Sequence, residues 1–153
     1  MSTAEERLAD LGLTLPPVAT PVAAYVPAVR TGNYVYTSGQ LPFVDGKLQG
    51  TGKVGESVTA EEAAGYARIA ALNALAAAAS AAGGLNAITR VVKVVVFVAS
   101  ATTFTGQAQV GNGASELLID VLGDAGKHAR SAVGMAVLPL DTPVEVEIVV
   151  EVA

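Results

Sequence analysis

The sequence predicts an α+β domain of two layers, with two helices on one face of a mixed β-sheet. Strand and helix signals follow one another as strand-strand, helix, strand, helix, strand-strand, and no internal repeat is evident. The 153 residues are close to the usual size of one domain, which buries a core without disulfide or metal staples. Two helices can cover one face of such a sheet, so this pattern leaves the other face uncovered within the chain.

An N-terminal segment precedes this pattern. Ala4 to Leu11 predicts a short helix, because two glutamates stand in its first turn, where carboxylates suit the helix dipole. Three prolines between Thr14 and Pro21 indicate an extended connector, since proline lacks the amide hydrogen that a helix needs. We therefore expect residues 1–21 to form a helix and connector, and residues 22–153 to form the domain itself.

Two hairpins are predicted in the next part of the chain. The runs Val22–Val29 and Tyr34–Thr37 are rich in valine and tyrosine, and the turn sequence Arg30-Thr31-Gly32-Asn33 separates them. An Asp-Gly pair within Phe43–Leu48 predicts a second, smaller hairpin.

Two helices follow. Thr59 opens the clearer one, because a glutamate three residues later completes a capping box, and the helical run continues to Ala82 before two glycines. The second is expected from Asn112, its candidate N-cap, to Leu122.

Three further strands complete the pattern. Arg90–Val98 is the strongest, and its valines point to both faces, so both faces of the sheet need covering. The last two strands are Ser131–Leu138 and Val144–Val152, and in the final one apolar residues alternate with carboxylates. An uncovered apolar face predicts association with other subunits.

Composition excludes several classes of function. The chain has no cysteine and one histidine, which rules out disulfides, thiolate metal sites and a multi-histidine zinc site. The net charge is −5 and no basic stripe is present, so nucleic acid is not an expected partner. The N-terminus lacks an apolar signal core and the helical run 69–82 is too short to span a bilayer, so we expect a cytoplasmic protein that makes no membrane contact.

A few residues are candidates for chemistry. Arg130 precedes a strand, where it is either an exposed or ion-paired residue or a guanidinium that grips a carboxylate through two parallel hydrogen bonds. Glu145 lies either on a solvated strand face or near Arg130, if the last two strands pair as a hairpin. Ser38-Gly39-Gln40 offers a hydroxyl, exposed backbone and an amide, or is an ordinary turn. Gly111-Asn112-Gly113 could receive an anion at a helix start, and His128 is expected to be a structural or surface residue.

Three segments of this sequence, in this order and spacing, resemble the signatures of the RidA/YjgF family, also called the endoribonuclease L-PSP family. The first runs from Gly32 to Pro42 and the second from Arg90 to Val98. The third is Arg130-Ser131-Ala132-Val133, followed by Leu138-Pro139 and Val144-Glu145-Val146-Glu147.

The resemblance implies a chorismate-mutase-like fold and a homotrimer, with the uncovered sheet face inward and a site in each of three clefts between subunits. It implies hydrolysis of reactive 2-imino acids and their enamine tautomers to 2-keto acids and ammonia, the activity of a 2-iminobutanoate/2-iminopropanoate deaminase. No metal or cofactor is implied. The implied partners are further copies of the chain and a small carboxylate-bearing imine or related metabolite.

The resemblance also assigns roles to residues. Arg130 would bind the substrate carboxylate, and Glu145 would orient or activate water near the imine carbon. Tyr25 would line the cleft, while Ser38 and Gly39 would supply polar and backbone contacts. An imine is already electrophilic, so positioning and a held water suffice for this chemistry.

The chain departs from the deaminase pattern in three places. These are the N-terminal segment 1–21, the longer segment Thr105–Ser115, and the substrate-contact position Ala132, where many deaminases have cysteine. Because branches of the family differ in activity, two alternatives stay open. One is a non-catalytic trimer that binds small carboxylates or senses a metabolite. The other is an endoribonuclease, against which the acidic balance and the lack of a histidine pair argue.

Overall fold

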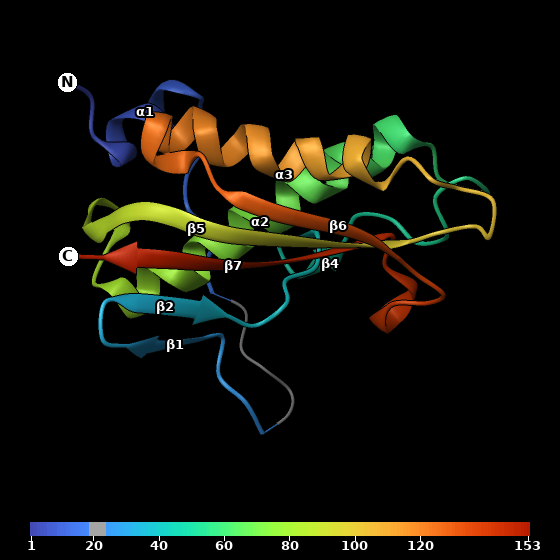
Figure 1. Cartoon of the computed structure of the whole chain (residues 1–153), viewed down its shortest axis with the longest axis horizontal. Helices are drawn as coiled ribbons and strands as arrows, with labels where there is room; N and C mark the ends of the chain where they lie inside the picture. The colour runs from blue at the N-terminus through green and yellow to red at the C-terminus, as the bar shows by residue number, and fades with distance from the viewer. Residues whose placement is uncertain (19–23) are drawn as a thin grey trace.

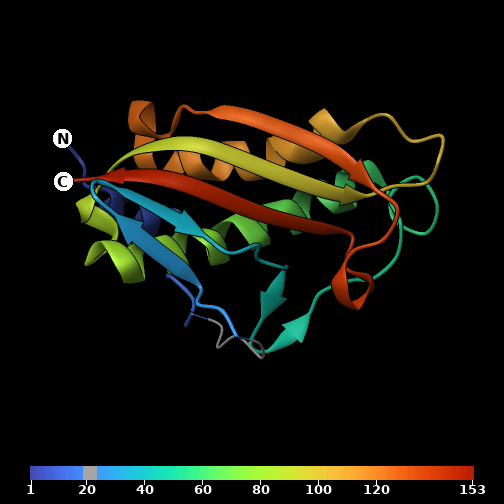
Figure 2. The same cartoon turned by 60° about the horizontal axis from the view of Figure 1, so that its bottom comes forward.

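A computed structural model describes residues 1–18 and 24–153. It has two layers, a five-stranded mixed sheet and a layer of helices on one of its faces (Figures 1 and 2). The strands of this sheet are β1 (Ala28–Thr31), β2 (Tyr34–Thr37), β5 (Ile88–Ala99), β6 (Ala129–Met135) and β7 (Val144–Val152). The α-helices are α1 (Ala4–Asp10), α2 (Ala60–Ala82) and α3 (Gln107–Leu122). The predicted two-layer α+β class is therefore confirmed.

Short elements connect these parts. The predicted small hairpin is present as β3 (Phe43–Val44) and β4 (Lys47–Leu48), and three 3₁₀ turns are η1 (Leu85–Ala87), η2 (Gly123–Gly126) and η3 (Pro139–Asp141). The expected connector and first strand include residues 19–23, which lie outside the described residues; within the described part, the first strand begins at Ala28. The predicted capping box is formed at Thr59 of α2, and the structure adds a second one at Thr3, before α1.

The strand order decides a pairing that the sequence left open. The sheet runs β1-β2-β7-β5-β6, so β5 lies between the last two strands, which do not pair with each other as a hairpin. The reason is the connection β5-α3-β6, because a helical crossover returns the chain parallel to its first strand and beside it. This places β6 at the outer edge of β5, and β7 then pairs antiparallel along the other edge.

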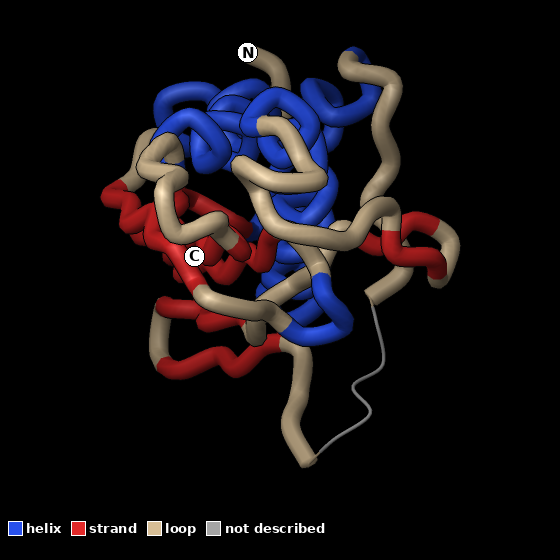
Figure 3. The backbone as a smooth tube through the Cα atoms, turned by 90° about the vertical axis from the view of Figure 1, so that its right-hand side faces the viewer, coloured by secondary structure: helices blue, strands red, loops and turns tan. Residues whose placement is uncertain are grey.

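The core lies between the sheet and the helices. The helix-facing side of β7 is buried at Val144, Val146, Ile148 and Val150, which confirms the alternation predicted for this strand. Figure 3 shows the helices gathered on one side of the strands. Within the described part of the chain, the opposite face stays open and exposes apolar side chains, among them Tyr34, Tyr36 and Val133 at 41%, 50% and 41% of their surface.

The start of α3 also differs from expectation. The helix begins at Gln107 rather than Asn112, so the run Gly111-Asn112-Gly113 lies inside it. Glycine disfavours helix by propensity, but here α3 approaches its neighbours closely. A Cβ at Gly113 would overlap the Ala64 carbonyl oxygen of α2, and a Cβ at Gly111 would press on Arg130. Packing has overridden propensity at both positions.

No helix in the described ranges is long and apolar enough to cross a membrane.

Candidate functional site

Arg130 lies on edge strand β6 and turns toward the helical layer. Its register partner on β5 is Val94, which is fully buried beneath the helices, and paired residues point to the same face of a sheet. Its guanidinium donates from Nη1 to Asn112 Oδ1 at 2.8 Å and to Ser115 Oγ at 3.1 Å. Nη2 donates to the Ala108 carbonyl oxygen at 3.2 Å. Three acceptors on α3 therefore fix this half-buried side chain.

Two of the five N–H donors of Arg130 are left over by these bonds. Both hydrogens of Nη1 and one of Nη2 are engaged, which leaves Nε–H and one Nη2–H without a partner in the described part of the chain. Nε–H and Nη2 are neighbours on one edge of the guanidinium, and two parallel donors match the two oxygens of a carboxylate. The alternative that Arg130 is only part of a surface ion pair does not fit these contacts.

Gly111 and Ala132 make room for this arrangement. A Cβ at Gly111 would lie 3.2 Å from Arg130 Cζ, 3.3 Å from its Nε and 3.2 Å from the Ala132 Cβ. The guanidinium thus packs against helix backbone, and a larger residue than alanine at position 132 would crowd the same space. Ala132, two residues after Arg130, points the same way because it pairs with buried Val96.

A second polar group forms at Glu145. It pairs with Phe97 at the far end of β5, on the open face of the sheet. Gly39 lies directly against it, since a Cβ at Gly39 would overlap the Glu145 carboxylate. The backbone of Gln40 bridges to Val146, which holds the Gly39 segment beside β7. Burial raises the pKa of the Glu145 carboxyl above its ordinary value, and the charge of Glu147 raises it further.

Ser38 comes directly before Gly39, and its hydrogen bonds reach the segment just after Tyr25. The Ser38 hydroxyl donates to the Val26 carbonyl oxygen at 2.6 Å, and its amide donates to Pro27 at 2.8 Å, so both groups help fix the approach to β1. Tyr25 precedes β1 and is 54% exposed.

The candidate residues therefore form two groups that one chain does not bring together. Arg130 and Ala132 face the helices from β6, whereas Glu145 and Gly39 lie on the open side of β7. Arg130 is opposite Ile148 across β5, three residues from Glu145, so the two Cα atoms are roughly 14 Å apart at ordinary strand spacing and rise.

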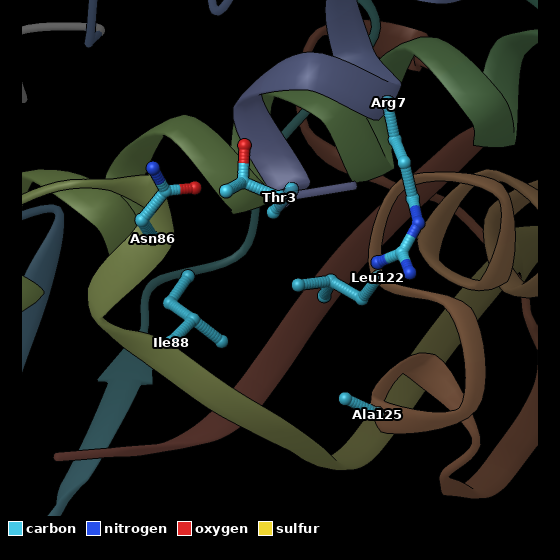
Figure 4. Close-up of a pocket in the computed structure, with 7 residues that line it drawn as sticks. Thr3, Arg7, Asn86, Ile88, Leu122 and Ala125 are labelled. Atoms are coloured by element: carbon cyan, nitrogen blue, oxygen red, sulfur yellow. The ribbon is translucent and has the colours of Figure 1, made fainter. Parts of the chain in front are cut away.

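Two hollows lie elsewhere on the chain. One, of about 250 Å³, is on the open face and is lined by Tyr36, Lys93, Glu147 and their neighbours. The other, of about 220 Å³, lies among α1, the start of β5 and the end of α3, with Arg7 and Asn86 at its rim (Figure 4). None of the residues assigned a role from the sequence lines either hollow.

The sequence did not indicate that residues of α3 hold Arg130. One stripe of α3 faces β6, and its members recur at helical spacing: Ala108, Gly111, Asn112 and Ser115. That stripe was hidden because the helix was expected to start at Asn112. His128 was assigned a structural role, yet it stands two residues before Arg130, the spacing of side chains on one side of a strand.

These features are those of a chorismate-mutase-like α+β domain. The family model described as "YjgF/chorismate_mutase-like, putative endoribonuclease" matches residues 5–152, and the chain belongs to this family. It is similar to Protein TCP17 of Trypanosoma cruzi, with 44% identity over 146 residues that span 95% of this chain and 91% of that protein.

Two solved structures are also similar. The protein Atu1372 of Agrobacterium tumefaciens, whose function is unknown, shares 46% identity, with 98% of this chain and 92% of that chain covered and a TM-score of 0.90. A "putative endoribonuclease" from Shewanella oneidensis shares 33% identity, with 99% and 100% covered and a TM-score of 0.95. The family and fold expected from the sequence are thus confirmed.

Proposed function

We propose that the protein is a homotrimer that hydrolyses small 2-imino acids and their enamine tautomers to 2-keto acids and ammonia in clefts between its subunits. The observation that carries this proposal is the state of Arg130, held by three acceptors on α3 with two donors left for one carboxylate. A small anionic ligand is the group that such an arginine recognises.

The separation of the two groups supports a site shared between copies. In a 2-imino acid the carboxylate carbon is bonded directly to the imine carbon, so the residues that act on them must lie within a few ångströms of the ligand. Arg130 and Glu145 of one chain are too far apart and on opposite faces, so the partner of each comes from another copy. The exposed apolar face supplies a surface for that association. Sedimentation equilibrium is expected to give three times the 15.3 kDa of the chain.

The chemistry then needs little beyond positioning. Arg130 binds the carboxylate, and the Glu145 carboxylate takes a proton from a water held at the imine carbon. The water oxygen bonds to that carbon while Glu145 passes the proton to the imine nitrogen. In the adduct the hydroxyl proton then moves to the amino nitrogen, the C–N bond breaks, and ammonia leaves the keto group behind. Tyr25 lines the cleft, and Ser38, Gly39 and Ala132 shape it. A carboxyl whose pKa is raised is a stronger base once ionised, which suits this role.

The direct test follows loss of 2-iminobutanoate, generated enzymatically, against formation of 2-oxobutanoate and ammonia. Acceleration by the purified protein supports the proposal, and an unchanged rate contradicts it. Saturable binding of 2-oxobutanoate without turnover identifies instead the trimer that binds carboxylates without catalysis, which the Arg130 geometry alone would permit.

Glu145→Gln is expected to lower kcat about 100-fold, the usual contribution of a positioned base. Because burial raises the pKa of Glu145, activity of the parent falls as the pH drops through that raised value, and Glu147→Gln moves this acid limb to lower pH by removing the like charge. Rate profiles from pH 4 to 9 check both. Because the pKa of Glu145 is raised in the folded protein, ionisation of its carboxyl at neutral pH disfavours the folded state. Glu145→Gln removes that cost, so it does not lower the free energy of unfolding at neutral pH. An unshifted limb in Glu147→Gln would contradict the assignment.

Ribonuclease activity is the second candidate, since the descriptions of the family and of the Shewanella structure name it. Incubation of labelled RNA with the parent and with Arg130→Ala tests it. Cleavage by the parent that is lost in the variant would support it, and intact RNA would exclude it.

A further inference from the structure

A chain of hydrogen bonds runs behind Arg130 from its guanidinium to a fixed backbone carbonyl. Ser115 Oγ accepts from Arg130 Nη1 at 3.1 Å and lies 2.8 Å from Nε2 of His128. The other ring nitrogen, Nδ1, lies 2.6 Å from the Gly126 carbonyl oxygen. The three links join α3, the residue before β6 and the turn η2.

The far end of this chain is held in place. Gly126 is buried in η2, and a Cβ there would overlap the Leu118 carbonyl oxygen of α3. Because the backbone of Gly126 is pressed against α3, its carbonyl oxygen offers His128 an acceptor that cannot move far.

The chemistry of each atom sets the direction of the bonds. A carbonyl oxygen only accepts, so Nδ1 of His128 must carry a hydrogen and donate it to Gly126. In the neutral ring Nε2 then accepts, and the Ser115 hydroxyl donates to it. This leaves the lone pairs of Ser115 Oγ free to accept from Arg130. The opposite tautomer would set two acceptors against each other at 2.6 Å.

We propose that Ser115 and His128 are positioning residues for Arg130, which set the rotation of its guanidinium so that Nε–H and the free Nη2–H meet the ligand carboxylate. This rests on the proposed function, because it specifies how the carboxylate of that substrate is captured. Asn112 and Ala108 bind the same guanidinium, but neither extends to a second element. The hydrogen bonds through Ser115 and His128 connect the guanidinium to the backbone just before β6. They therefore fix the free edge of the guanidinium, with Nε–H and Nη2–H, relative to that strand.

The tautomer is directly observable, because the chain contains a single histidine. Nitrogen-15 spectra of the intact protein are expected to show His128 protonated at Nδ1, with Nε2 as a hydrogen-bond acceptor. Addition of 2-oxobutanoate is expected to shift the Nε2 resonance in the parent but not in Arg130→Ala. A ring protonated at Nε2 alone would overturn the proposal.

Binding and kinetics of matched variants separate positioning from folding. Ser115→Ala and His128→Leu are expected to raise the Kd for 2-oxobutanoate and the KM for 2-iminobutanoate about 10-fold, as loss of one bond to a charged group does, with kcat unchanged. Ser115→Thr keeps the hydroxyl and restores parental values. Ser80→Ala, which removes a hydroxyl bonded to Ala77 within α2, is the control and leaves both constants unchanged.

The outcomes distinguish this inference from the proposed function. If the parent neither binds 2-oxobutanoate nor accelerates imine loss, the proposed function fails and the positioning role with it. If the parent does both while Ser115→Ala and His128→Leu match it, the positioning role alone is wrong.

Discussion

Arg130→Ala is expected to weaken binding of 2-oxobutanoate about 100-fold or more and to raise the KM for 2-iminobutanoate in parallel. In the proposed site the two free N–H donors of Arg130 would each form a charge-assisted bond with the carboxylate, and such bonds contribute about 1.5–3 kcal/mol apiece. Arg130→Lys keeps the charge but not the fork of donors, so it recovers only part of the affinity. Titration calorimetry measures the affinities, and the coupled imine assay measures KM.

Arg68→Ala is the matched control for this prediction. Arg68 also lies on the surface and its guanidinium is 3.4 Å from Asp120, but it is part of an ordinary exposed ion pair. Such pairs contribute little, so binding and turnover should match those of the parent. Equal affinity in Arg130→Ala and Arg68→Ala would remove the basis of the carboxylate site.

The sequence was informative wherever periodicity alone decides structure. The alternation of Val144–Val152, the capping box at Thr59 and the long apolar strand predicted β7, α2 and β5. Strand order was not predictable in this way. A short connection such as that from Met135 to Val144 can join two strands that pair directly, or two strands with a third between them, as here.

The site, like the strand order, was predicted only in part. Arg130 and Glu145 were candidates from the strand pattern and received their roles from the family resemblance, but only the register showed that they lie on opposite faces of one chain. The residues that hold Arg130 were hidden by the glycines of α3, which by propensity end or start a helix. At those glycines α3 approaches its neighbours closely, so the local signal that suggested a loop marks tertiary contact instead.

Gly113→Ala is therefore expected to lower the free energy of unfolding by about 2 kcal/mol, although alanine is the better helix former. The added methyl group would overlap the Ala64 carbonyl oxygen of α2, and because this is a backbone atom in a helix, relief requires α2 and α3 to separate. Loss of that spacing exposes the buried alanines that line α2 and weakens the contact between the two helices. Urea unfolding at fixed protein concentration, followed by circular dichroism, measures the change.

Gly65→Ala on α2 is the opposite case and the control. A Cβ at Gly65 meets no atom within 4 Å, so the substitution adds helix propensity without a clash and is expected to raise the free energy of unfolding by about 0.5–1 kcal/mol. The two variants make the same chemical change in the interior of a helix and differ in what the methyl group meets. If both stabilise the protein, the close approach of α2 and α3 is not a constraint, and the glycine run in α3 has another cause. Opposite signs would show that helix spacing, on which the stripe holding Arg130 depends, requires glycine at position 113.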